Sequence, residues 1–183
     1  MSGDHYHIRN QNAIYFLTFT VIDWVDVLTR REYRLIITDS LNHCIKEKGL
    51  TVFSWVIMSN HMHLIVKAKE GSQISAIIRD FKKYTAKMII AEMHNISESR
   101  IVWIKKKMLF AGNRLNRISK YKFWRDDNCA KELDGNDILE QKLNYIHLNP
   151  VKALIVERPE QYIFSSAKDY NGTKGLVNIE ILL

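Results

Sequence analysis

Three side chains in this sequence have the chemistry needed to cut a phosphodiester: His61, His63 and Tyr145. The two histidines are two residues apart in a segment typical of a β-strand, so both imidazoles point to one face and can chelate one divalent ion. Tyr145 lies near the end of a predicted helix, and Asn149 follows it by one helical turn. A phenol beside a metal-bound phosphate can attack phosphorus and form a covalent phosphotyrosine bond. The amide oxygen of Asn149 is a ligand type that suits Mg²⁺ or Mn²⁺.

Each of these residues also has an ordinary structural interpretation. Histidine pairs at this spacing are common on surfaces, and the chain has a second pair, His5 and His7, in a segment without a strand pattern. Tyr145 can be a half-buried aromatic residue, and Asn149 before Pro150 is typical of the N-cap of a new helix. The residues alone do not select the nucleophile, because other tyrosines compete for that role: Tyr84, Tyr121, Tyr162 and Tyr170.

Basic residues are concentrated in the middle third of the chain. The net charge of +7 favours a polyanionic partner, because phosphate neutralisation by lysine and arginine releases counterions. The candidate DNA-binding residues are Arg79, Lys82, Lys83, Lys87, Arg114, Arg117, Lys120, Lys122 and Arg125. The aromatic residues between these positions can stack on unpaired bases: Phe81, Tyr84, Trp103, Tyr121, Phe123 and Trp124. The alternative is a solvated charged face. Trp24 and Trp55 are expected in the core.

Composition predicts one domain over residues 1–183, with 1–12 as a flexible N-terminus and 167–183 as a C-terminal tail. The chain is 46% hydrophobic, which is enough to form a real core. Cys44 and Cys129 are isolated and read as reduced thiols, and we find neither a signal peptide nor a membrane-spanning run. We therefore expect a cytoplasmic protein that associates with the nucleoid when it binds DNA.

The elements that would position these side chains can be read from periodicity. Strands are predicted at 13–21, 51–57, 62–67 and 121–133, and helices at 30–48, 72–93, 97–111 and 136–148. Ser97 is the expected cap of the third helix, and residues 112–120 are expected to form a loop. This order predicts an α+β fold: a ferredoxin-like, split βαβ antiparallel sheet with helices on one face, plus a C-terminal helical tail.

Two sequence blocks resemble a known family. The first, W-V-I-M-S-N-H-M-H-L-I-V at 55–66, resembles the signature W-V-x-M-P-N-H-x-H-L-L-V of single-tyrosine, insertion-sequence-type transposases, which belong to the His-hydrophobic-His nucleases. The second, Y-I-H-L-N-P-V-K-A at 145–153, with R-P-E-Q-Y at 158–162 and Ser165-Ser166, is similar to a block of the REP-associated tyrosine transposase branch. Ser59 stands where proline is usual, and Leu154 where glycine is common.

The resemblance implies a ferredoxin-like domain that cleaves and rejoins single-stranded or hairpin DNA. It implies that His61, His63 and Asn149 bind Mg²⁺ or Mn²⁺, and that Tyr145 is the nucleophile that forms a 5′-phosphotyrosine link. A homodimer, in which Tyr145 acts on the other subunit's site, is compatible with it. Two other functions stay open: a non-catalytic, domesticated protein that binds DNA repeats, and a metal-dependent phosphodiesterase that uses water.

Overall fold

The centre of the protein is an antiparallel sheet of four strands in the order β2-β3-β1-β4. The computed structural model describes residues 8–113 and 121–182. Aromatic and β-branched residues make up the central strands, as β-structure favours. The strands are β1 (Tyr15–Thr20), β2 (Leu50–Ile57), β3 (His61–Ala68) and β4 (Lys131–Glu132). A tight hairpin joins β2 to β3, closed by a 2.8 Å hydrogen bond from Met58 N to His61 O.

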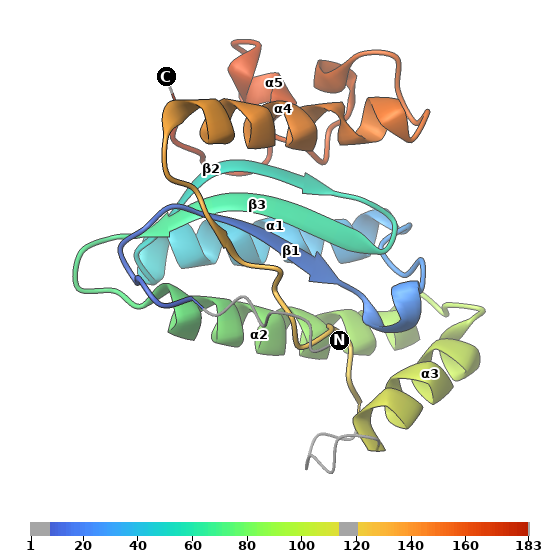
Figure 1. Ribbon diagram of the computed structural model, residues 1–183. Coiled ribbons are helices and arrows are strands. Elements are labelled where there is room, and N and C mark those ends of the chain that lie inside the picture. The colour runs from blue at the N-terminus through green and yellow to red at the C-terminus, as the bar shows by residue number, and fades with distance from the viewer. Residues whose placement is uncertain (1–7, 114–120, 183) are drawn as a thin grey trace, which may run out of the picture.

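Helices cover both faces of this sheet (Figure 1). The longer helices are α1 (Arg31–Glu47), α2 (Ile74–Asn95), α3 (Ile101–Asn113) and α4 (Asn136–Lys152). On one side α1 and α2 pack together, and on the other side α4 crosses β2 and β3. The α+β class and the antiparallel sheet are confirmed. The prediction that the helices lie on one face holds for α1 and α2, whereas α4 covers the other face. All eight residues of β2 are buried, so both of its faces need a cover.

The fourth strand is much shorter than the segment 121–133 that was expected to form it. Only Lys131–Glu132 pairs regularly with β1. The rest of the segment follows β1 through separated hydrogen bonds: Thr18 N to Asn128 O, Arg125 N to Thr20 O, and Ile22 N to Phe123 O. The consecutive polar residues 126–128 and the positive φ of Cys129 (40°) interrupt a regular ladder.

The third helix begins later than predicted. Ser97 has a φ of 51° and lies in the turn after α2, so it does not cap α3. The buried carboxylate of Glu98 fixes this turn instead, because it forms ion pairs with Arg30 and Arg100. Helix α3 continues to Asn113, so the expected loop at 112–120 starts inside a helix, and residues 114–120 lie outside the described part of the chain.

The C-terminal segment covers the edge of the sheet rather than forming a helical tail. It contains two short helical turns, η2 (Pro159–Gln161) and α5 (Ala167–Tyr170). Ile57 N donates to Phe164 O, Ser166 N donates to Trp55 O, and Glu180 N donates to Val52 O. These bonds satisfy the outer edge of β2, which would otherwise be open to pairing with another chain.

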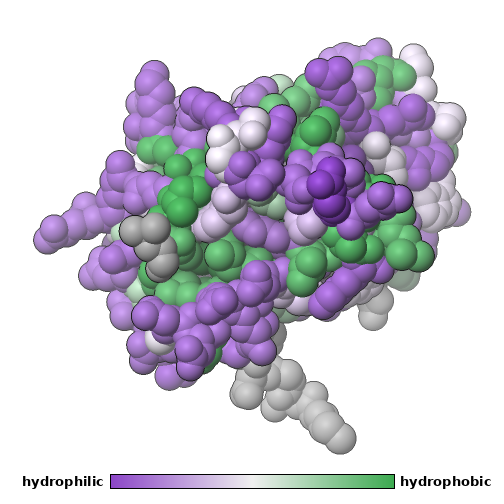
Figure 2. All heavy atoms as spheres, turned by 90° about the horizontal axis from the view of Figure 1, so that it is seen from above, coloured by the Kyte–Doolittle hydropathy of each residue, from purple (hydrophilic) through white to green (hydrophobic). Residues whose placement is uncertain are grey.

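A single hydrophobic cluster joins the sheet to α1, α2 and α4, and Trp55 lies fully buried within it. Seen from the α4 side, the surface mixes hydrophilic side chains with separate hydrophobic patches (Figure 2). No helix in the described part of the chain is both long and apolar enough to cross a membrane.

Candidate active site

The two histidines of β3 lie side by side on the face of the sheet that α4 covers. Their ring centroids are 4.8 Å apart, which is close enough for both rings to bind one ion about 2 Å from each nitrogen. His63 lies directly opposite Thr18 of β1, and the Thr18 hydroxyl is 2.8 Å from His63 Nδ1. If Nδ1 carries the proton and donates to Thr18, the Nε2 lone pair is left for a metal.

Asn60 fixes the orientation of His61. The Asn60 amide nitrogen donates to Trp24 O (3.2 Å) and to Asp26 Oδ1 (3.0 Å), so its oxygen faces His61 Nδ1 at 2.7 Å. A carbonyl oxygen can only accept, so Nδ1 of His61 must carry the proton and Nε2 must hold a lone pair. The asparagine of the N-H-M-H motif therefore sets the tautomer that a metal ligand needs.

Burial keeps both imidazoles neutral. It lowers the pKa of His61, and it lowers the pKa of His63 to about 3, with further lowering by His61 and Lys142. Nε2 of His63 is buried and, among the described residues, has no hydrogen-bond partner. A buried, neutral nitrogen without a partner costs free energy unless something binds it, and a divalent ion fits that position.

Helix α4 brings Tyr145 to these histidines. Its ring lies edge-on to the His63 ring at 5.2 Å and to Phe16 at 6.0 Å, and the side chain is 38% exposed. The ammonium groups of Lys142 and Lys152 lie 5.4 and 6.0 Å from the centre of the Tyr145 ring. The phenol is thus accessible, next to the candidate metal ligands and beside two positive charges.

The competing tyrosines lie elsewhere. Tyr162 and Tyr170 donate their hydroxyls to backbone carbonyls of β2, Ile57 O and Phe53 O. Tyr84 is exposed on α2, on the other side of the sheet, and Tyr121 lines a hollow beside that helix. Among these candidates, only Tyr145 contacts a histidine of the pair.

Asn149 belongs to the same helix as Tyr145. Helix α4 runs through Pro150 to Lys152, so the alternative of Asn149 as the N-cap of a new helix is wrong. The spacing of four residues sets Asn149 one turn beyond Tyr145 on the same side. Within residues 8–113 and 121–182, no three His, Cys, Asp or Glu side chains are grouped to hold a metal.

A buried polar cluster attaches α4 to the sheet. His147 Nε2 is 2.9 Å from Ser166 Oγ and 3.3 Å from Ser54 Oγ, and the two hydroxyls are 3.0 Å apart. Ser166 Oγ also accepts from Trp55 N at 3.0 Å. The cluster joins α4, β2 and the C-terminal segment two residues from Tyr145, so it holds the helix that carries the candidate nucleophile.

We expect this cluster to make the protein less stable in acid. Burial lowers the pKa of His147 to about 4, from 6.5 in the unfolded chain. The unfolded state therefore binds a proton first, and the stability present above pH 6.5 falls by up to about 1.4 kcal/mol per pH unit toward pH 4. His147→Ala should lower the free energy of unfolding by about 2–4 kcal/mol and weaken its pH dependence in urea titrations. His43→Ala, at an exposed site on α1, is the control, and equal pH profiles for the two variants would refute the assignment.

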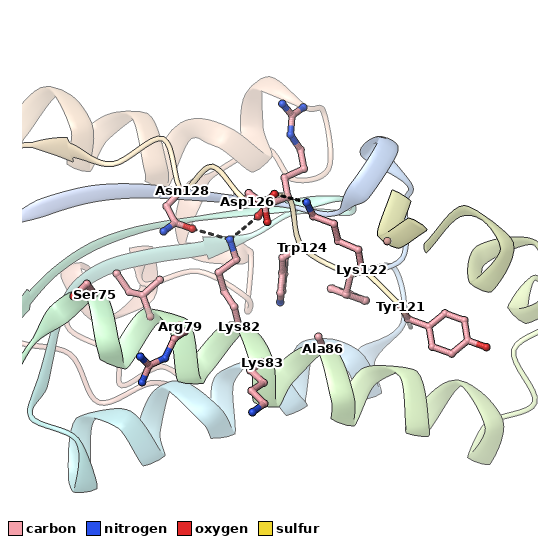
Figure 3. A pocket seen from close by; sticks show the side chains of 14 residues that line it. Ser75, Arg79, Lys82, Lys83, Ala86, Tyr121, Lys122, Trp124, Asp126 and Asn128 are labelled. Carbon is pink, nitrogen blue, oxygen red and sulfur yellow. Dashed lines mark hydrogen bonds and ion pairs between the residues drawn. The ribbon is translucent and has the colours of Figure 1, made fainter. Parts of the chain in front are cut away.

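The basic residues of α2 lie on the opposite side of the sheet from His63. Arg79, Lys82 and Lys83 line a hollow of about 390 Å³ between α2 and residues 121–128 (Figure 3). Lys82 is half-buried there: its ammonium donates to Arg125 O and Asn128 Oδ1, and desolvation lowers its pKa to about 8. Lys82 is thus already bound to the protein itself, whereas Lys83 and Lys87 are exposed.

Other predicted DNA-binding residues differ in their positions. Lys122 forms an ion pair with Asp126, and Arg125 forms one with Asp127. The Arg125 guanidinium lies near Trp24, 5.9 Å from the centre of its ring. Arg114, Arg117 and Lys120 lie outside the described residues, as do His5 and His7.

Several residues of the site were not found by sequence reasoning. Trp55 is buried as expected, but Trp24 is 54% exposed and its ring is 6.0 Å from His61, so its placement in the core was wrong. Lys142 and Lys152 could have been found, because they lie three residues before and seven after Tyr145 on one helical side. Thr18 could not, because strand register is needed to pair it with His63.

Comparison with known proteins shows the family to which the chain belongs. Residues 10–121 match the model of a family described as "Transposase IS200 like". No functionally curated protein matches the chain in sequence. A solved REP-associated tyrosine transposase bound to a REP hairpin is similar in fold: the TM-score is 0.64 at 16% identity, over 99% of this chain and 93% of that one. A putative transposase from Deinococcus radiodurans matches at 12% identity over 76% of this chain and 93% of the other, with a TM-score of 0.46. The family match covers more than half of the chain, which therefore belongs to the IS200-like transposases.

Proposed function

We propose that this transposase cleaves and rejoins single-stranded or hairpin DNA through a covalent 5′-phosphotyrosine intermediate on Tyr145. The observation that supports this most strongly is the contact between Tyr145 and His63, with ring centroids 5.2 Å apart. A reactive phenol, two neutral imidazoles and two lysines converge there from β3 and α4.

The phenol oxygen of Tyr145 attacks the scissile phosphorus. The new bond joins Oη to phosphorus, the bond to the 3′ oxygen breaks, and the phenolic proton is balanced by the proton that the released 3′-hydroxyl gains. Lys142 and Lys152 attract the phosphate and stabilise negative charge that develops beside the ring. A second 3′-hydroxyl then attacks the same phosphorus and releases Tyr145, so the bond energy is stored and no nucleotide triphosphate is needed.

The residues present fit a divalent ion. His61, His63 and Asn149 would hold it, through the Nε2 atoms of the two histidines and the amide oxygen of Asn149. A bound Mg²⁺ or Mn²⁺ supplies Lewis-acid polarisation of the scissile phosphate. Because imidazole nitrogen is a softer donor than oxygen, we expect Mn²⁺ to bind this set more tightly than Mg²⁺.

The proposed DNA partner is a hairpin with unpaired flanks. The support is the similar fold of the REP-associated transposase, whose solved structure holds a REP hairpin. The net charge of +7 is consistent with a polyanionic ligand.

A denaturing gel tests the proposal. The protein is incubated with labelled hairpin DNA from the flanks of its own gene, with Mn²⁺ or with EDTA. We expect a metal-dependent band at the mass of protein plus DNA. Cleaved product without this band would instead support a phosphodiesterase that uses water, and binding without product would support a domesticated repeat-binding protein.

Asn149→Ala should weaken metal binding and leave the fold intact. The amide is half-buried on α4 and would supply one oxygen ligand, so its loss should raise the Mn²⁺ requirement of adduct formation by about 10-fold or more. Titration calorimetry with Mn²⁺ measures this directly. The matched control is Asn144→Ala, an exposed asparagine of the same helix, and equal Mn²⁺ affinities for the two variants would exclude Asn149 as a ligand.

A further inference from the structure

Trp24 is an exposed aromatic residue at the edge of the candidate active site. It belongs to η1 (Ile22–Trp24), the short turn at the end of the β1 arrow (Figure 1). The side chain is 54% exposed, and its ring lies edge-on to the His61 ring with centroids 6.0 Å apart. Tryptophan is the largest apolar side chain, so an exposed one beside a polar site indicates a binding surface.

The backbone of this turn is held in an unfavourable conformation. Asp23 and Trp24 have positive φ angles, 52° and 55°, which non-glycine residues seldom adopt. Trp24 N donates to Val21 O at 3.1 Å, and Trp24 O accepts from the Asn60 side chain at 3.2 Å. Since strain of this kind persists only where surrounding contacts enforce it, the backbone position of Trp24 is specified by the fold.

Asn60 connects the indole to the metal site. The same side chain that donates its amide N–H to Trp24 O also orients His61, because its amide oxygen lies 2.7 Å from Nδ1 of that histidine. The Trp24 backbone and the His61 imidazole are therefore held relative to each other by one residue. A ligand group that stacks on Trp24 would be held at a defined place next to His61.

Charged side chains lie next to the indole. The Arg125 guanidinium is 5.9 Å from the centre of the Trp24 ring, and Arg125 N is fixed by a 2.9 Å bond to Thr20 O. Trp24 and Arg125 line an open hollow of about 460 Å³, together with Ile22, Asp23, Lys122, Asp126 and Asp127. Three cations border the turn, and each is paired with a carboxylate of the same surface: Arg125 with Asp127, Lys122 with Asp126, and Lys107 with Asp23. An aromatic face with cations beside it is the arrangement that binds single-stranded nucleic acid, because bases stack and phosphates pair with the cations.

We propose that Trp24 is the stacking platform for one unpaired nucleobase next to the scissile phosphate, with Arg125 contacting the adjoining backbone. The inference rests on the proposed function, since it sets the base beside the phosphate that Tyr145 attacks. Stacking there fixes the single strand on the His61 side of the site, while Lys142 and Lys152 contact it on the Tyr145 side. Trp24 is thus a positioning residue that selects unpaired over paired DNA at the cleavage point.

The first test measures binding of the same hairpin DNA, with unpaired flanks. The parent protein for this test carries Tyr145→Phe, so that it binds DNA without cleaving it, and it is compared with the same protein carrying Trp24→Ala as well. Loss of one base stack should weaken binding by about 5- to 150-fold, and Trp24→Phe should recover most of it. Phe110→Ala, another exposed aromatic side chain on α3, should bind as the parent does. Thermal unfolding of each variant shows whether the fold is retained. Equal binding by the parent and Trp24→Ala overturns the proposal.

A second test locates the base. Abasic nucleotides are placed in turn at each unpaired position of the hairpin DNA. An abasic nucleotide at one position next to the cleavage point should weaken DNA binding by the parent protein as much as Trp24→Ala does. The same abasic DNA should bind the Trp24→Ala protein only slightly more weakly than intact DNA does, because the stack is already lost. Fully additive losses at every position overturn the proposal.

The two proposals can fail separately. If the wild-type protein forms no covalent adduct but DNA binding depends on Trp24 and on one base, the proposed strand-transfer function is wrong and the proposed stacking platform is supported. If the adduct forms and binding is independent of Trp24, the platform fails and the function stands.

Discussion

Replacing Tyr145 with phenylalanine will abolish the covalent protein–DNA adduct. The substitution removes only the hydroxyl, so the ring keeps its contacts with His63 and Phe16 and the fold should be unchanged. Loss of the nucleophile removes the bond-forming atom itself, and losses of about 10⁴-fold or more are usual for such groups. Denaturing gels with Mn²⁺ and labelled hairpin DNA measure the rate of adduct formation.

The matched control is Tyr84→Phe. Tyr84 is an exposed tyrosine on α2, and the substitution keeps its ring available for stacking while removing its hydroxyl. We expect adduct formation at the parent rate for this variant, and DNA binding at the parent level for both. A Tyr145→Phe protein that still forms the adduct would show that another residue is the nucleophile.

Replacing His63 with alanine should have the second-largest effect. His63 is 5% exposed, and among the described residues its Nε2 has no hydrogen-bond partner, so the substitution removes a nitrogen that is proposed to bind the metal and that has no other role in the described structure. Outer-shell changes at metal sites already cost 10- to 100-fold in affinity or activity, and loss of a ligand should cost at least about 100-fold in Mn²⁺ affinity. Calorimetry and the adduct assay measure the two effects.

The control for His63→Ala is His43→Ala, which removes an exposed imidazole from α1. Adduct formation by His63→Ala should recover in part at high Mn²⁺ concentration, because His61 and Asn149 remain. Unchanged Mn²⁺ affinity in His63→Ala would contradict the assignment of this histidine as a ligand.

Local patterns were sufficient to predict the strand that carries the histidines and the helix that carries Tyr145. The alternation in β3 sets His61 and His63 on one face whatever their surroundings, and the structure keeps them there. Helix α4 was expected to end near Leu148, because proline disfavours helical geometry in the residue before it. Pro150 nevertheless lies inside the helix, in the last turn of α4, and is buried.

Features that depend on tertiary contacts could not be read from the sequence. Trp24 looks like a core residue by composition, and only the turn after β1 exposes it. Lys82 fits the basic pattern of α2, but the segment after α3 folds over it and binds its ammonium group. Leu154 has a φ of 57° just after α4, which explains why glycine is common at this position in the family that the sequence resembles.

Mass spectrometry of the adduct is the most direct test of the proposed covalent intermediate on Tyr145. The protein–DNA adduct formed with Mn²⁺ is digested with a nuclease and a protease, and the peptide that carries the remaining nucleotide is sequenced. The proposal predicts a 5′-phosphonucleotide on the Tyr145 side chain, with a free 3′-hydroxyl on the released strand. A nucleotide on any other residue, or cleaved DNA with no modified peptide, would contradict it.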